Sequence, residues 1–206
     1  MAAPELHLVA DRLAMRFGSR RLFEGLSFAL GPGERFAVLG DNGSGKSTLL
    51  RILAGVLAPT SGTVRLSLGG APVRDDLRPL RVGFAAPALQ LYDDLSAAEN
   101  LQFITRLRGL AEPGARIDQV LARVGLGERR DDRVRAFSTG MRQRLRLATA
   151  LLPDAPLILL DEPGAALDAA GRELVRSLVA ESTAAVVLAT NDPAEAALCP
   201  RSVRIG

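Results

Sequence analysis

Lysine occurs once in this 206-residue chain, and it lies within a glycine-rich segment suited to phosphate binding. Of the 26 basic residues, Lys46 is the only lysine and the other 25 are arginine, so a compact point charge is used at this position alone. The segment fits G-x-x-x-x-G-K-[ST] in full, through Gly40, Asp41, Asn42, Gly43, Ser44, Gly45, Lys46 and Ser47. This pattern predicts a loop that binds the phosphates of a nucleotide.

The chemistry of such a loop explains its residue types. Gly40, Gly43 and Gly45 allow positive φ, so successive backbone N–H groups can turn toward one anion, which the dipole of the following helix also favours. Lys46 can reach the β- and γ-phosphates, and the Ser47 hydroxyl is placed to ligate Mg²⁺. We therefore expect the nucleotide contacts to extend from Gly40 through Thr48.

Two adjacent carboxylates form the second candidate site. Asp161 and Glu162 follow the continuous apolar run 157–160, which is typical of a parallel strand buried on both faces. The carboxyl end of such a strand is where α/β folds bind ligands. We expect Asp161 to hold Mg²⁺ through its water shell and Glu162 to orient or deprotonate an attacking water. The alternative is a purely structural acidic turn.

Polar groups also lie at the ends of three other predicted elements. Ser138 and Gly140 open a helix that ends before Pro153, where unpaired N–H groups could bind an anion or could form an ordinary cap. Asp168 is a candidate N-cap for the next helix. Asn191 follows an apolar run at 184–189, again at the carboxyl end of an expected strand.

The elements that must position these groups alternate between strands and helices. The apolar run 36–39 predicts a buried strand before the phosphate loop, and apolar residues at helical spacing predict a helix after it that Pro59 ends. Further core strands are expected at 81–86 and 202–205. Alternating apolar residues predict three antiparallel strands, at 6–10, 22–30 and 63–68, and the turn between the first two is expected at 16–20.

The region between these strands is expected to be mostly helical. Ser96 and Glu99 form a capping box ahead of an apolar helical stripe that Gly109 stops. A second helix is expected from about Ala115 to Gly125.

Composition limits the class of protein. A hydrophobic content of 48% and a charged content of 24% are typical of a globular domain. The net charge of +3 supports a nucleic-acid or anionic-lipid partner only weakly. Cys199 is the single cysteine, which favours a reducing compartment, and no apolar run approaches the roughly 20 residues that span a bilayer. With no signal peptide at Met1–Glu5, a soluble cytoplasmic protein is expected.

In their order along the chain, these motifs resemble those of the ATP-binding subunits of ABC transporters, over about residues 5–206. The segment from Gly40 to Ser47 looks like Walker A, and 157–162 looks like Walker B with its catalytic glutamate. The segment 137–141, Phe-Ser-Thr-Gly-Met, matches the signature motif in a form milder than Leu-Ser-Gly-Gly-Gln. Its position about twenty residues before Walker B is the most specific feature, because other P-loop NTPases lack it.

The resemblance extends to two nucleotide contacts outside these motifs. Residues 164–168 lie where the D-loop of this family belongs, so Asp168 is expected near nucleotide. Phe17 lies where the aromatic residue that stacks on adenine is expected. The implied cofactors are ATP and Mg²⁺.

The expected fold class is α/β, a P-loop NTPase (RecA-like) core with an antiparallel β subdomain and an inserted α-helical subdomain. Residues 1–206 are expected to form a single ABC ATPase domain. The predicted boundaries are 5–35 and 60–70 for the β subdomain, 36–59 and 154–206 with 80–87 for the nucleotide-binding core, and 88–153 for the helical subdomain.

The resemblance also implies a mechanism that needs two chains. Subunits of this family bind head to tail, so Ser138 and Gly140 of one chain would close on the γ-phosphate held by Lys46 of the other. ATP would hold this homodimer or heterodimer together, and its hydrolysis would release it. The helical subdomain would transmit the cycle to separate transmembrane permease subunits, so the chain would lie on the cytoplasmic face of the membrane.

Two positions depart from the family pattern. The glutamine usually found just after the strand at Phe84 aligns with Pro87, while Gln90 comes three residues later and is a candidate replacement near Mg²⁺ and water. The histidine usually found after the penultimate strand is replaced by Asn191, which can donate a hydrogen bond to the γ-phosphate but cannot carry charge. Slower hydrolysis with intact ATP binding is the expected consequence.

Two other functions remain as alternatives. The leading interpretation is the ATPase subunit of an exporter, because the short chain without a carboxyl-terminal extension resembles small exporter subunits, including the heme-exporter type of cytochrome c maturation. A soluble ABC ATPase acting on nucleic acid or ribosomes is the second, on the strength of Arg142, Arg144 and Arg146 along one helix. An ATP-gated scaffold with little turnover is the third. Nucleic acid is not the expected partner.

Overall fold

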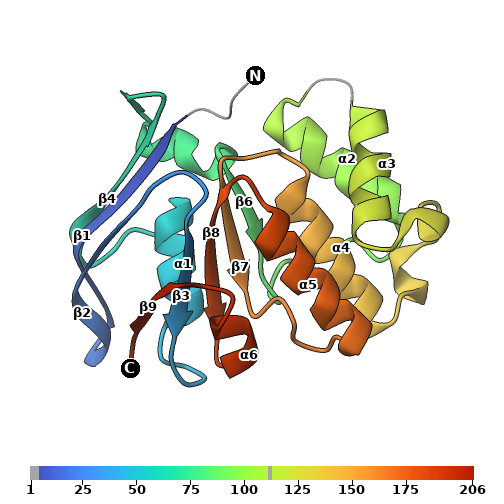
Figure 1. The fold of residues 1–206 in the computed structure, drawn as a ribbon. Helices are drawn as coiled ribbons and strands as arrows, with labels where there is room; N and C mark the ends of the chain where they lie inside the picture. The colour runs from blue at the N-terminus through green and yellow to red at the C-terminus, as the bar shows by residue number, and fades with distance from the viewer. Residues whose placement is uncertain (1–4, 111–112) are drawn as a thin grey trace.

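The computed structural model describes residues 5–110 and 113–206, which form two sheets on either side of one helix (Figure 1). Residues 1–4 and 111–112 of the predicted domain lie outside the described residues. The N-terminal sheet is antiparallel in the order β2-β1-β4-β5, and its strands are β1 Leu6–Phe17, β2 Arg20–Leu30, β4 Ser61–Leu68 and β5 Ala71–Pro72. The predicted antiparallel strands are confirmed, but the turn is shorter than expected, because only Gly18 and Ser19 separate β1 from β2.

The second sheet is entirely parallel, in the order β6-β7-β8-β3-β9. Its strands are β3 Arg35–Leu39, β6 Val82–Ala85, β7 Leu157–Asp161, β8 Ala185–Thr190 and β9 Arg201–Arg204. Every residue of β7 and β8 is buried, as expected for strands covered on both faces. Because the strands are parallel, the carboxyl ends of β3, β7 and β8 share one edge of the sheet, and the predicted site residues follow them there.

Helix α1, Lys46–Ala54, packs between the two sheets (Figure 1). Leu49, Leu50 and Leu53 are fully buried in a core that also includes the inner faces of β1 and β4. The prediction that Pro59 ends this helix is wrong. Gly55 takes a left-handed φ of 79° and its N–H caps the last turn, so the helix ends earlier and Val56 is 56% exposed.

The opposite face of the parallel sheet is covered by helices. The covering helices are α4 Thr139–Leu151 and α5 Ala169–Glu181, whereas α2 Ala97–Arg108 and α3 Pro113–Arg123 lie against each other and against α4. The short α6, Pro193–Ala196, follows β8. Helix α4 lies so close to β6 that a Cβ on Gly83 would be 2.0 Å from the Ala150 carbonyl oxygen. Three short 3₁₀ helices complete the described elements, at Asp75–Leu80, Gly127–Arg129 and Val134–Ala136.

Helix α4 connects the helical region to the core. It contacts α2 and α3 and also packs on β6 and β7. The Ser96–Glu99 capping box that begins α2 is confirmed, since each residue's side chain accepts the other's backbone N–H. The subdomain boundaries stay a prediction, with α4 shared between two of the proposed units. No helix within the described ranges is both long and apolar enough to cross a membrane.

Candidate functional site

The loop between β3 and α1 has the backbone that the glycine pattern predicts. Gly40, Gly43 and Gly45 have φ values of 156°, 82° and 105°. Space as well as φ requires glycine at Gly40, where a Cβ would lie 2.4 Å from the Ile205 carbonyl oxygen. The loop is therefore shaped around its glycines, and its tip, residues 41–43, is exposed.

Lys46 is the first residue of α1 and is only 4% exposed. Its Nζ donates to the carbonyl oxygens of Gly40, at 2.8 Å, and Asp41, at 3.1 Å. The same nitrogen lies 3.6 Å from Oε1 of Glu162. The lysine thus joins the phosphate loop to the carboxyl end of β7, as a phosphate-binding lysine beside a catalytic carboxylate would.

Asp161 ends β7 and is also 4% exposed. Burial raises the pKa of its carboxyl group, and a hydrogen bond with the Ser47 side chain opposes that effect. Among the residues that the structure describes, none forms a hydrogen bond with its Oδ1 atom or with Oγ of Ser44 in the phosphate loop. An unpaired buried oxygen is costly, and oxygen ligands are those that Mg²⁺ prefers, so Asp161 and Ser47 fit the expected metal site.

Glu162 lies on a turn with unusual backbone geometry. Its φ is 46°, in the left-handed region that non-glycine residues rarely adopt. Its N–H donates to the Ala189 carbonyl at 2.8 Å, so the turn is connected to β8. The side chain is 34% exposed, which leaves the carboxylate accessible to a water molecule. Such strained backbone occurs preferentially at functional sites.

Asn191 follows β8 and reaches the phosphate loop. Its Nδ2 donates to Oδ1 of Asn42 at 3.1 Å. The structure therefore brings Asn191 beside the loop, as sequence reasoning predicted from its position after a strand. Its expected role toward the γ-phosphate stays a prediction.

The β1–β2 hairpin lies beside the same loop. Phe17 ends β1 and is 54% exposed, so its ring is available for stacking. Arg20 begins β2, and its Nη2 donates to the Gly43 carbonyl at 2.8 Å. Sequence reasoning missed Arg20. No motif surrounds Arg20 in the sequence. Its contact with Gly43 depends on how the antiparallel sheet packs beside the phosphate loop.

The signature segment begins α4. Ser138 is its N-cap and accepts the Met141 N–H at 3.2 Å. A Cβ on Gly140 would lie 3.5 Å from the Ala166 carbonyl, so this segment lies against the loop that ends at Asp168. Asp168 caps α5 as predicted, through the Gly171 N–H. Among the described residues, no hydrogen bond or ion pair joins Ser138, Gly140 or Asp168 to the phosphate loop.

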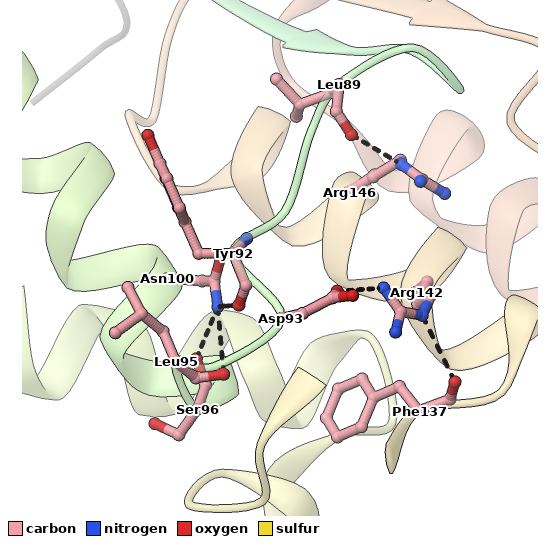
Figure 2. A network of polar contacts seen from close by, with 9 residues as sticks. All are labelled: Leu89, Tyr92, Asp93, Leu95, Ser96, Asn100, Phe137, Arg142 and Arg146. Carbon is pink, nitrogen blue, oxygen red and sulfur yellow. Dashed lines mark hydrogen bonds and ion pairs between the residues drawn. The ribbon is translucent and has the colours of Figure 1, made fainter. Parts of the chain in front are cut away.

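Gln90 is not brought into the site by any hydrogen bond or ion pair within residues 5–110 and 113–206. It is exposed, in the segment that follows β6. Two arginines of α4 bind this segment: Nε of Arg146 donates to the Leu89 carbonyl at 3.0 Å, and Arg142 pairs with Asp93 (Figure 2). Gln90 as a metal or water ligand stays a prediction.

Two buried side chains that sequence reasoning missed hold the turn after Glu162. Nε2 of Gln143 donates to the carbonyls of Glu162, at 3.3 Å, and Pro163, at 3.1 Å. Oε1 of Glu195 accepts the Gly164 N–H at 2.7 Å, and burial raises the pKa of this carboxyl group. The only signal in the sequence was a polar residue on an apolar helix face at Gln143.

Comparison with known families gives a match over most of the chain. Residues 23–165 match the family described as ABC transporter. A Nod factor export ATP-binding protein I of Paraburkholderia xenovorans is 37% identical over 205 residues, which cover 96% of this chain and 67% of that protein. A cytochrome c biogenesis ATP-binding export protein of Methylococcus capsulatus is 42% identical over 175 residues, covering 84% of this chain and 83% of that protein.

Other relatives are longer, and a linearmycin resistance ATP-binding protein of Bacillus subtilis is covered over only 56% of its length. Among solved structures, an ATP-binding subunit of an ABC transporter superposes with a TM-score of 0.84 at 26% identity, over 96% of this chain and 85% of that one. A dimeric ATP-binding cassette with ADP and Pi has a TM-score of 0.80 at 24% identity, covers 96% of this chain and 94% of that one, and supports the fold alone.

Proposed function

The chain belongs to the ABC transporter family of ATP-binding proteins, and we propose that it is the ATP-hydrolysing subunit that powers a separate exporting permease. One observation carries this proposal. Lys46, Asp161 and Glu162 meet at one edge of the parallel sheet, with Nζ of Lys46 3.6 Å from Oε1 of Glu162. A buried lysine in a phosphate loop beside an accessible carboxylate is the arrangement that phosphoryl transfer to water needs.

The proposed chemistry follows from these positions. Backbone N–H groups from Gly40 to Thr48 bind the phosphates, and Lys46 offsets the charge on the γ-phosphate. Glu162 accepts a proton from the water whose oxygen attacks the γ-phosphorus, while the bond from that phosphorus to the leaving oxygen of ADP breaks. Asn191, adjacent to Asn42, donates a hydrogen bond to the γ-phosphate but cannot accept or hold an extra proton there.

Ser47 and Asp161 would hold Mg²⁺, which when bound neutralises phosphate charge. Within the described residues, no group of three or more His, Cys, Asp or Glu side chains could hold a metal. The ion's remaining ligands would then be phosphate oxygens and water, together with Gln90 if the predicted role of that residue holds. Metal and nucleotide are therefore expected to bind together.

A second chain would complete the site. Ser138 and Gly140 lie at the N-terminus of α4, where unpaired N–H groups favour an anion. We propose that they contact the γ-phosphate bound by another copy or by a related subunit. Asp168, on the adjoining loop, would lie in the same interface, and Phe17 would stack on adenine.

The permease is expected to dock beside α2. Tyr92 and Phe103 form an edge-to-face pair with ring centroids 4.9 Å apart, and they are 50% and 37% exposed. Leu107, further along α2, is 66% exposed. Adjacent exposed apolar side chains on a soluble domain mark a surface for a partner. This docking would place the chain on the cytoplasmic face of a membrane.

The named relatives are ATP-binding proteins of different export systems, one for Nod factor and one for cytochrome c biogenesis. We therefore propose export of heme or another small molecule, with the cargo selected by the permease. The rival nucleic-acid function depends on Arg142, Arg144 and Arg146. Their guanidinium groups lie near partners within the chain: Asp93 for Arg142, Asp168 for Arg144 and the Leu89 carbonyl for Arg146. This engagement favours the transporter function.

Glu162→Gln should bind ATP without hydrolysing it, and it supplies the test. The tagged variant is purified with Mg-ATP from native membranes in mild detergent, and the proteins recovered with it are identified. A multi-span membrane protein in matching amount is expected. Recovery of nucleic acid or soluble protein alone would favour the rival function.

A further inference from the structure

We propose that Gln143 is a positioning residue for Glu162, and that Arg146 connects it to the segment after β6. This inference rests on the proposed function, because it concerns the carboxylate that would activate water. Gln143 lies on α4, is only 4% exposed, and is not among the residues proposed above to bind nucleotide. Its carboxamide donates to two successive carbonyls, those of Glu162 and Pro163.

These two hydrogen bonds act on backbone that needs support. Glu162 has a left-handed φ of 46°, which costs free energy for a residue with a side chain. The turn is held from both sides, by Gln143 at its carbonyls and by the buried Glu195 at the Gly164 N–H. Because φ and ψ of Glu162 set the direction of its Cα–Cβ bond, the turn sets where the carboxylate lies relative to Lys46.

Arg146 fixes the orientation of the Gln143 amide. Its Nη1 lies 3.5 Å from Oε1 of Gln143, and because this oxygen faces a donor, Nε2 is left to face the turn. Nε of the same arginine donates to the Leu89 carbonyl at 3.0 Å (Figure 2). One guanidinium therefore contacts both the segment after β6 and the amide that holds the catalytic turn.

The segment that Arg146 contacts is itself well ordered by hydrogen bonds. The Asn100 side chain, 2% exposed, bonds both backbone groups of Tyr92 and the Ser96 carbonyl, and Asp93 pairs with Arg142 (Figure 2). Tyr92 is also part of the exposed aromatic pair proposed to contact the permease. A displacement of this segment would therefore reach Glu162 through only two side chains, Arg146 and Gln143.

The test compares Gln143→Leu, which keeps most of the volume but cannot donate, with Gln143→Glu, which keeps the shape but presents acceptors to the two carbonyls. Thr149→Val is the matched control, since Thr149 is a buried polar residue on the same helix whose hydroxyl, among the described residues, donates to the Arg146 carbonyl and to no other group. We expect both Gln143 variants to lower kcat by about tenfold to a hundredfold, the effect of misplacing a catalytic group. The Kd for ATP should stay within about twofold, because no phosphate contact is removed.

A second measurement does not depend on hydrolysis. Hydrogen exchange at the amides of Gly164 and Ala165 should be faster in Gln143→Leu than in wild type, and unchanged in Thr149→Val. Arg146→Gln should lower kcat less than Gln143→Leu. The double variant should be no worse than Gln143→Leu alone, since coupled residues are non-additive.

Three results would overturn the inference: an unchanged kcat in Gln143→Leu, unchanged amide exchange, or a kcat loss that Thr149→Val shares. Misfolding of Gln143→Leu would show as lost ATP affinity. In that case the kcat of Gln143→Glu decides whether the inference holds. Wild-type protein that hydrolyses no ATP would instead refute the proposed function, and the exchange result would still report on the turn.

Discussion

Nζ of Lys46 and Oε1 of Glu162 lie 3.6 Å apart, although the two residues are 116 positions apart in the sequence. The lysine begins α1 and the glutamate follows β7, so the contact exists only because β3 and β7 end at the same edge of the sheet. The buried ammonium also bonds two carbonyls of the phosphate loop. This lysine is therefore placed to stabilise both an anionic ligand and the carboxylate beside it.

Lys46→Met should bind ATP at least tenfold more weakly than wild type, because a charge-assisted contact with the phosphates contributes roughly 1.5–3 kcal/mol. Lys46→Arg should also bind ATP more weakly than wild type. The guanidinium group is larger and planar, so it cannot replace a buried ammonium group that donates to two carbonyl oxygens. Fluorescent-nucleotide titration measures both. Wild-type affinity in Lys46→Arg would contradict the need for a compact charge.

Asp161→Asn should make the nucleotide-free protein more stable while removing its response to Mg-ATP. Burial raises the pKa of Asp161 in the folded chain above its unfolded value. The folded chain therefore binds more protons between these two pKa values, so the free energy of unfolding falls as pH rises through that window. At pH 8 the ionised, buried carboxylate is at its most costly, and the asparagine variant avoids this cost.

Thermal melting from pH 4 to pH 8 checks this prediction. Asp161→Asn should melt at a higher temperature than wild type at pH 8, by about 2–4 °C per kcal/mol gained, and the gap should narrow toward pH 4. Mg-ATP should raise the melting temperature of wild type alone, and EDTA should abolish that rise. A variant that Mg-ATP still stabilises as much as wild type would exclude Asp161 as a metal ligand.

Asn191→His should increase kcat. A histidine at this position can bind and release a proton beside the γ-phosphate, whereas asparagine can only donate a hydrogen bond. We expect kcat to rise several-fold, with the largest increase near neutral pH, and the Kd for ATP to stay unchanged. Asn191→Ala is the control and should lower kcat, since it loses the hydrogen bond to Asn42. If Asn191→His leaves kcat at the wild-type value, the substitution does not limit hydrolysis.

Arg20→Ala should weaken ATP binding by about fivefold, the effect of one hydrogen bond worth roughly 1 kcal/mol that orders the phosphate loop. Arg21→Ala is a matched control one residue away, because Arg21 pairs with Glu24 and, among the described residues, no hydrogen bond or ion pair joins it to the loop. Isothermal titration of both variants measures the difference. Equal affinities would mean that the Arg20–Gly43 contact does not order the loop.

Local chemistry made part of this site predictable from the sequence. The glycines of the phosphate loop take positive φ as predicted, because a residue without a Cβ reaches these angles at little steric cost. Asp161 and Glu162 lie at a strand end because the apolar run before them forms a buried parallel strand. The helix after the loop was predicted too long, because a left-handed Gly55 ends it before Pro59 can.

Long-range contacts account for what sequence reasoning missed. Gln143 bonds the carbonyl of Pro163, and Glu195 bonds the N–H of Gly164. Both partners are backbone groups, which leave no side-chain pattern, and each is distant in the sequence. Only the packing of α4 and α6 around the carboxyl end of β7 brings these groups together. Arg20 is a similar case, since its partner is the Gly43 carbonyl.

Steady-state phosphate release at increasing chain concentration tests the central claim most directly. Wild-type protein with Mg-ATP should hydrolyse ATP, and the rate per chain should rise with concentration, because in the proposed mechanism two chains complete each site. Glu162→Gln should bind ATP with unchanged affinity and lose kcat by about a hundredfold or more, as removal of a general base predicts. Hydrolysis by Glu162→Gln at the wild-type rate would contradict the assignment of Glu162 and the mechanism built on it.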